Sequence, residues 1–164
     1  MTPKLAATLL RLNGIGFIIF CTVFVTIAFP GYDGFALHIA DLFDWTGAPY
    51  TETLSRDARW FGAIWSGLGA GFGALYLWVV APLLTLPNRD AQNIAKRGGL
   101  IAVSIWFVVD SIGSYAAGLP SNVAMNFIFT VLTAIPLVLV KFDNREIYGF
   151  MTPIKDQNLG GQFA

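Results

Sequence analysis

Long, almost uncharged apolar stretches alternate along this chain with short charged segments. The stretches 12–32, 60–88 and 98–140 contain a single charged residue, Asp110. About 20 apolar residues suffice to cross the hydrocarbon core of a bilayer as an α-helix, and the third stretch is long enough for two. The pattern predicts an all-α protein with one integral membrane domain over residues 1–164. Its four transmembrane helices are expected at about residues 9–29, 58–84, 98–117 and 122–141.

The segment between the first two predicted helices has a pattern of its own. Apolar residues recur there at helical spacing, at Phe35, Ile39, Leu42 and Phe43. Polar residues between positions 38 and 44 fall on another face. This pattern predicts a short amphipathic helix on the outer membrane surface.

The basic residues are distributed unevenly between the predicted loops. Of ten lysines and arginines, only Arg56 and Arg59 lie in the first loop, beside five acidic residues. The other eight lie before the first helix, between the second and third, or after the fourth: Lys4, Arg11, Arg89, Lys96, Arg97, Lys141, Arg145 and Lys155. Because basic loops stay in the cytoplasm, we expect both termini there, in a multi-pass protein of the bacterial inner membrane.

Composition narrows the classes of function. The chain is 55% hydrophobic and 12% charged, with zero net charge and a mean hydropathy of +0.63. No basic face for nucleic acid is expected, and the single cysteine, Cys21, excludes an intrachain disulfide. We find no glycine-rich phosphate loop, no pair of histidines and no nucleophile with a base in reach. The sequence therefore predicts no catalytic residue, no metal site and no cofactor.

Asp110 is the most distinctive residue of the predicted bundle. It lies about 12 Å from the outer end of its helix at 1.5 Å per residue, where an ionisable group costs about 2.5–3.5 kcal/mol. Helical counting puts Thr130 at the same depth and Asn126 level with Ser114, and Arg59 is the candidate cation. We therefore expect Asp110 within hydrogen-bonding or one-water reach of Thr130 or Asn126, or of an arginine. Three roles remain open for this cluster: a structural fastening, a proton or cation site, or a contact with lipid, pigment or a neighbouring subunit.

The second predicted helix is rich in small residues spaced by four. Gly62 begins one such series, and Gly67 and Gly71 belong to another. Small residues at this spacing let two helix backbones approach closely in a membrane. We therefore expect these three glycines to pack against other helices, within the chain or across a homodimer.

Residues 142–164 form a predicted cytoplasmic tail. The tail combines charges with four apolar residues, Ile147, Tyr148, Phe150 and Met151, and ends in a glycine-rich run. These apolar residues are candidates for docking on a partner, because they are too apolar to remain in water beside a membrane.

Several short motifs resemble a known family. They are Arg59-Trp60-Phe61-Gly62 with the glycine-rich helix that follows, Asp110, and the Gly118-Leu119-Pro120-Ser121 turn. Over residues 56–140 the chain resembles a family of small uncharacterised bacterial four-helix membrane proteins. The resemblance implies the four-helix fold and no particular activity.

Two functions from different classes follow. The first is a non-catalytic accessory subunit of a larger membrane complex, photosynthetic or respiratory, whose partners are other membrane subunits and the bilayer. The second is a small transporter or ligand-binding membrane protein that uses the intramembrane Asp110.

Overall fold

The computed structural model describes residues 1–44 and 54–142. In these ranges the chain forms helices and no strand. The order is α1 (Pro3–Phe24) with the 3-10 turn η1 (Val25–Ala28), α2 (Gly34–Phe43), α3 (Arg56–Leu75) with the π-helical turn η2 (Tyr76–Val80) and α4 (Ala81–Leu84), α5 (Arg89–Ala116), and α6 (Pro120–Leu139). Four continuous helical segments are long and apolar enough to cross a membrane. This confirms the predicted all-helical, four-span architecture.

The helices begin earlier than the apolar pattern indicated. The Thr2 hydroxyl caps α1 by accepting a hydrogen bond from the backbone N–H of Leu5 at 3.3 Å. The Asn88 side chain caps α5 by accepting one from Ala91 N–H at 3.0 Å. Most of the loop expected at residues 87–97 is therefore helical. Hydropathy locates the apolar part of a helix, whereas a capping side chain decides where its first turn forms.

The π-helical turn η2 has a local cause. Pro82 has no N–H to give to the carbonyl four residues earlier, that of Trp78, and its ring crowds that carbonyl. The widened turn at Tyr76–Val80 accommodates this gap. The turn begins at Tyr76, whose hydroxyl donates to the carbonyl oxygen of Gly99 on α5 at 2.6 Å.

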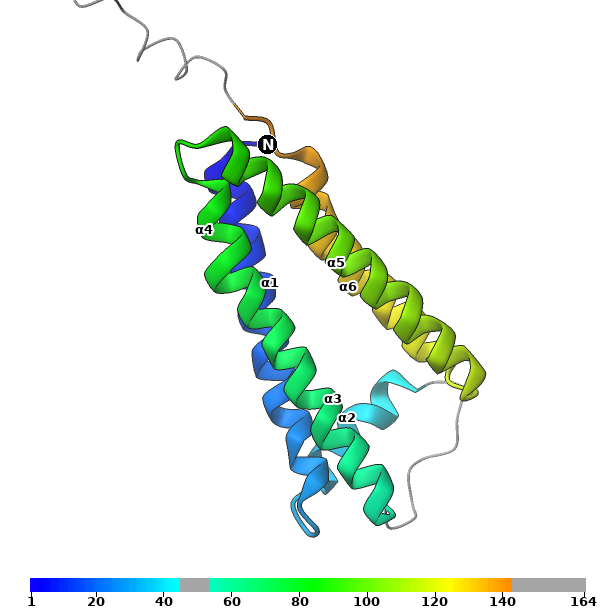
Figure 1. Cartoon of the computed structure of the whole chain (residues 1–164). Helices are drawn as coiled ribbons and strands as arrows, with labels where there is room; N and C mark the ends of the chain where they lie inside the picture. The colour runs from blue at the N-terminus through cyan, green and yellow to red at the C-terminus, as the bar shows by residue number, and fades with distance from the viewer. Residues whose placement is uncertain (45–53, 143–164) are drawn as a thin grey trace, which may run out of the picture.

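The long helices form two antiparallel hairpins (Figure 1). One pairs α1 with α3, and the other pairs α5 with α6. The hairpins meet at the end of the bundle where Met1 lies, which we call the closed end. They diverge toward the other end, which we call the open end, and α2 lies between them there.

Hydrogen bonds to main-chain carbonyl oxygens hold the closed end together. The N-terminal ammonium of Met1 donates to Leu139 O at 3.0 Å, and Lys141 N–H donates to Met1 O at 2.9 Å. The Lys96 ammonium donates to Val138 O at 3.2 Å. A hydrophobic core cluster joins both hairpins near this end, through side chains that include Leu10, Tyr76, Leu84, Val103 and Leu137.

Glycines bring α1 and α3 into close contact, but not all of those predicted. A Cβ on Gly73 would lie 2.8 Å from Gly14 O, and a Cβ on Gly14 would lie 2.7 Å from Gly73 O. Gly62 contacts Ile27, whereas Gly67 and Gly71 are exposed with nothing within 4 Å. Gly67 and Gly71 therefore make no close contact within the described part of the chain, and their packing against another copy stays a prediction. Gly69 and Gly73, on the adjacent face of the same helix, make the contact within the chain.

The outer surface of the bundle is apolar. On α5 alone, six aliphatic side chains are more than half exposed: Ile94, Ile101, Ile105, Val108, Val109 and Ile112. Apolar surface of this extent suits lipid rather than water. With the four long helices, it defines a candidate multi-pass membrane protein.

Candidate functional site: an aromatic cavity between the hairpins

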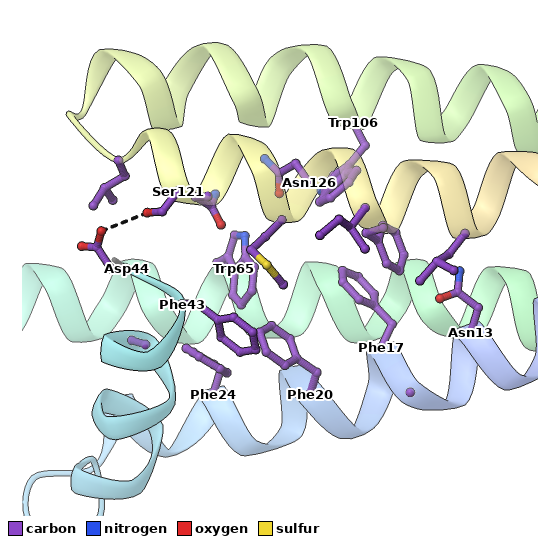
Figure 2. A pocket seen from close by; sticks show the side chains of 18 of the residues that line it. Asn13, Phe17, Phe20, Phe24, Phe43, Asp44, Trp65, Trp106, Ser121 and Asn126 are labelled. Atoms are coloured by element: carbon purple, nitrogen blue, oxygen red, sulfur yellow. Dashed lines mark hydrogen bonds between the residues drawn. The ribbon is translucent and has the colours of Figure 1, made fainter. Parts of the chain in front are cut away.

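A cavity of ≈ 430 Å³ lies between the two hairpins in the open half of the bundle (Figure 2). Residues of α1, α2, α3, α5 and α6 line it. From Ser121 to Leu132 its wall on α6 extends about 16 Å at 1.5 Å per residue. This volume is within the usual range for small-molecule sites. The cavity exists because the hairpins diverge, so the sequence pattern did not predict it.

Aromatic side chains form most of the wall. The ring of Phe17 stacks on Phe129 with centroids 4.1 Å apart, and meets the edge of Trp106 at 6.1 Å. Closer to the open end, Phe20 makes edge contacts with Phe43 at 6.3 Å and with Trp65 at 6.2 Å. Such rings lock one another in place, so the wall is largely pre-formed.

Three asparagine amides are the main neutral polar groups of the lining. On α1, Asn13 donates through Nδ2 to the hydroxyl of Thr133 at 2.6 Å. That hydroxyl gives its own proton to Phe129 O at 2.9 Å, so it can only accept from Asn13. The orientation of the Asn13 amide is therefore fixed, with its NH₂ group engaged and its carbonyl oxygen available.

Asn122 and Asn126 connect the cavity to Asp110. Nδ2 of Asn126 donates to Asp110 Oδ2 at 2.5 Å, and Nδ2 of Asn122 donates to the same oxygen at 3.2 Å. Asn122 also donates to the Ser114 hydroxyl at 2.7 Å, and Asn126 to the Ser111 hydroxyl at 3.4 Å. Both asparagines line the cavity, whereas Asp110 lies behind them on α5. The carboxylate therefore faces amide donors rather than lipid.

The residues of α5 and α6 that lie side by side differ from those predicted to lie at the same depth. Asp110 meets Asn126, not Thr130, and Ser114 meets Asn122. In each pair the two residues are equally far along the chain from Gly118. The positive φ of Gly118, 78°, makes the tight turn between α5 and α6. The helix begins at Pro120, earlier than the start at Asn122 used in counting. Residues of α6 therefore lie about one turn from the expected depth. The Thr130 hydroxyl is buried without a hydrogen-bond partner among the described residues.

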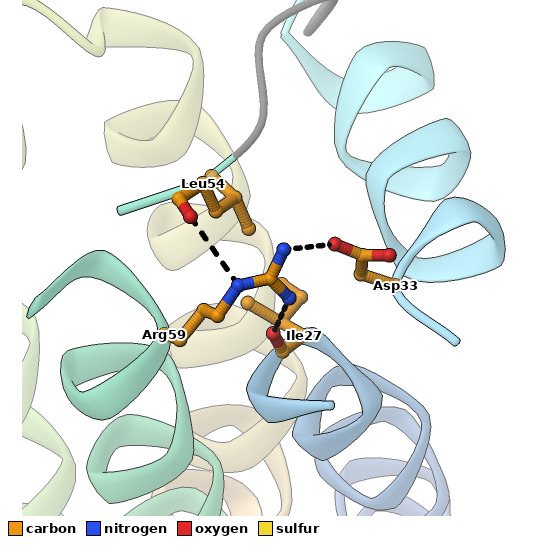
Figure 3. A network of polar contacts seen from close by, with 4 residues as sticks. All are labelled: Ile27, Asp33, Leu54 and Arg59. Atoms are coloured by element: carbon orange, nitrogen blue, oxygen red, sulfur yellow. Dashed lines mark hydrogen bonds and ion pairs between the residues drawn. The ribbon is translucent and has the colours of Figure 1, made fainter. Parts of the chain in front are cut away.

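Arg59 is not the cation of the Asp110 cluster. Its guanidinium binds Asp33 Oδ2 at 2.7 Å, Ile27 O at 2.9 Å and Leu54 O at 3.3 Å (Figure 3). The hydrogen bond and charge of Arg59 lower the pKa of Asp33 below its ordinary value. This contact holds the segment before α2 against α3, outside the cavity.

The cavity also has a carboxylate at its open end. Asp44, which follows α2, accepts a hydrogen bond from the Ser121 hydroxyl of α6 at 2.9 Å. This bond joins α2 to the far hairpin. Asp44 is the only acidic residue among those that line the cavity, and none of the described lining residues is basic.

The sequence predicted a polar cluster of Asp110, Ser114, Asn126, Thr130 and Arg59. Three of these five residues lie together in the structure, where Asn122 joins Ser114 to Asp110 and Asn126 donates to Asp110. Sequence reasoning missed Asn13 and Asp44 as lining groups. Asn13, an amide within the first apolar stretch, was a signal that could have identified the site. The proposed docking residues Ile147, Tyr148, Phe150 and Met151 lie outside the described residues.

Comparisons with known proteins add no assignment. No protein-family model, no curated protein and no solved structure matches the chain. The resemblance to small bacterial four-helix membrane proteins therefore stays a prediction. Over residues 1–44 and 54–142, no group of three or more His, Cys, Asp or Glu side chains is arranged to hold a metal ion.

Proposed function

We propose that this protein is a ligand-binding membrane protein whose site is the cavity between the hairpins. One observation carries the proposal: a space of ≈ 430 Å³, walled by aromatic rings, has three amides on its lining. Protein interiors are close-packed and leave few voids larger than a water molecule. A cavity of this size, mostly apolar with a few convergent polar groups, is typical of a binding site for a small molecule.

A pair of glycine variants tests this proposal. Gly16 lines the cavity and has nothing within 4 Å of an added Cβ, so Gly16→Phe fills the space without a backbone clash. Gly113 also has nothing within 4 Å but is exposed outside the cavity, so Gly113→Phe is the matched control. The full-length protein in lipid nanodiscs is titrated with N-phenyl-1-naphthylamine, a neutral fluorescent probe.

Saturable binding above that of empty nanodiscs is expected for the wild type and for Gly113→Phe, and its loss is expected for Gly16→Phe. Equal binding by both variants, or no saturable binding by the wild type, would refute the proposal.

A second candidate is the accessory subunit of a larger membrane complex, photosynthetic or respiratory. The exposed glycines of α3 favour it, because Gly67 and Gly71 leave a flat face on which another helix can pack. The apolar residues of the tail are the other proposed dock. Extraction in mild detergent followed by native mass spectrometry tests for partners. Co-purification of the same partners with Gly67→Leu and with the chain truncated after Arg145 would reject both surfaces.

The membrane and orientation are part of the proposal. The distribution of basic residues favours a bacterial inner membrane with Met1 and the closed end in the cytoplasm. In that orientation, α2 lies at the outer surface and the cavity occupies the outer half of the bilayer.

A further inference from the structure

We infer that the ligand of the cavity is a lipophilic organic ammonium ion, with an aromatic or branched apolar body. This inference rests on the proposed function and specifies its ligand class. It is based on three features of the cavity lining: a carboxylate, oriented amide carbonyls and the faces of aromatic rings.

The charge of the lining is the first support. Among the described residues of the lining, Asp44 is the only ionisable one, and Asp110 lies directly behind Asn122 and Asn126. No basic side chain belongs to the described lining. In a low-dielectric site this distribution favours a cation and disfavours an anion such as a lipid phosphate.

The orientation of the amides is the second support. Asn13, Asn122 and Asn126 each use Nδ2 as a donor to Thr133, Ser114, Ser111 or Asp110. Oδ2 of Asp110 accepts a hydrogen bond from Nδ2 of Asn122 and of Asn126, so both amides turn their NH₂ side toward the carboxyl group. The carbonyl oxygens of all three amides accept no hydrogen bond from the described residues. They are available to the N–H donors of an ammonium group.

The aromatic wall is the third support. A cation over the face of a Trp or Phe ring is attracted by the ring quadrupole, more strongly when it is desolvated. Trp65, Trp106, Phe20 and Phe43 surround the space next to the polar groups, and Phe17 and Phe129 extend it toward Asn13. The head of the ligand is thus expected near Asn126 and Asp44, with its apolar body along the rings.

The test compares three compounds with one skeleton and different charge: 2-(1-naphthyl)ethylammonium, the corresponding neutral alcohol and the corresponding carboxylate. Binding to the full-length protein in phosphatidylcholine nanodiscs is measured by equilibrium dialysis at pH 7, with empty nanodiscs subtracted. The variants are Asp44→Asn and Asp110→Asn. Asp57→Asn is the control, because Asp57 lies in the first turn of α3 and does not line the cavity.

The ammonium is expected to bind at least tenfold more tightly than the alcohol, and the carboxylate most weakly. Asp44→Asn should remove most of this preference, Asp110→Asn should reduce it about threefold or more, and Asp57→Asn should leave it unchanged. The alcohol should bind all four proteins alike, which shows that the variants are folded.

Two results overturn the inference in different ways. If the alcohol binds as tightly as the ammonium and Gly16→Phe abolishes both, the cavity binds ligands but does not select cations. If none of the three compounds binds above empty nanodiscs, both the cation inference and the proposed ligand-binding function fail.

Discussion

The close approach of α1 and α3 allows a sharp prediction about stability. In Gly73→Ala the new Cβ would lie 2.8 Å from Gly14 O and 3.0 Å from a side-chain carbon of Ile18. The nearest atom is a backbone oxygen, which cannot move without shifting the whole helix. Overpacking a tight contact costs about 1–3 kcal/mol. We therefore expect Gly73→Ala to lower the free energy of unfolding by that amount.

Gly71→Ala is the matched control for this substitution. It adds the same methyl group to the same helix, two residues away, where nothing lies within 4 Å. Helices in a membrane remain largely formed when they separate, so a gain from helix propensity is expected to be small. Gly71→Ala should change the free energy of unfolding by less than about 0.5 kcal/mol, as surface substitutions usually do.

Reversible unfolding in bicelles, followed by near-ultraviolet circular dichroism of the tryptophans, measures both variants. A difference of less than about 0.5 kcal/mol between Gly73→Ala and Gly71→Ala would contradict the close contact between α1 and α3. If Gly71→Ala proved the more destabilising of the two, α3 would instead face α1 with its Gly67–Gly71 face.

The remaining predictions concern charge and orientation. Asp110→Asn should be tolerated, whereas Asp110→Leu should remove the carboxyl acceptor that the Asn122 and Asn126 amides share and cost about 1–3 kcal/mol; equal stability of the two variants in the bicelle assay would contradict this. Because Arg59 lowers the pKa of Asp33, their contact should stabilise the fold above the unfolded pKa of about 4 and be lost as the pH falls through the lower folded value. The protection factors of the α2 amides, which correct the exchange rates for their intrinsic pH dependence, should fall in that acid range, and in Asp33→Asn they should not change with pH. In single-cysteine variants, position 41 should react with an impermeant external reagent and position 93 should not; labelling of position 93 would reverse the orientation.

The polar cluster shows how far the sequence reaches. A carboxyl group in an apolar helix needs donors, so Asp110 by itself predicts polar partners on the neighbouring helix. Which residue becomes its partner depends on the length of the turn between α5 and α6, and the hydropathy pattern does not give that length. The tight turn at Gly118 and the start of α6 at Pro120 bring Asn126, and not Thr130, to Asp110.

Arg59 illustrates a different limit. Its position at the predicted outer end of the second span made it a candidate partner for the buried carboxylate, since few other cations are expected near the membrane. The structure instead gives it Asp33 and two backbone carbonyls. Pairing with Asp33 at the end of the bundle requires less desolvation of the guanidinium than pairing with a carboxylate deep between the helices. Only the folded loop, however, brings Asp33 next to Arg59.

The sequence by itself determined the helical class and the four spans, because the membrane requires long uncharged segments with internal hydrogen bonds. It could not determine which face of each helix points inward, because small and apolar residues surround α3 and lipid is as apolar as a protein core. Tertiary structure decided that Gly69 and Gly73 contact α1 while Gly67 and Gly71 face outward. It also decided that the hairpins diverge, and this divergence creates the cavity between Phe17, Trp106 and Asn126.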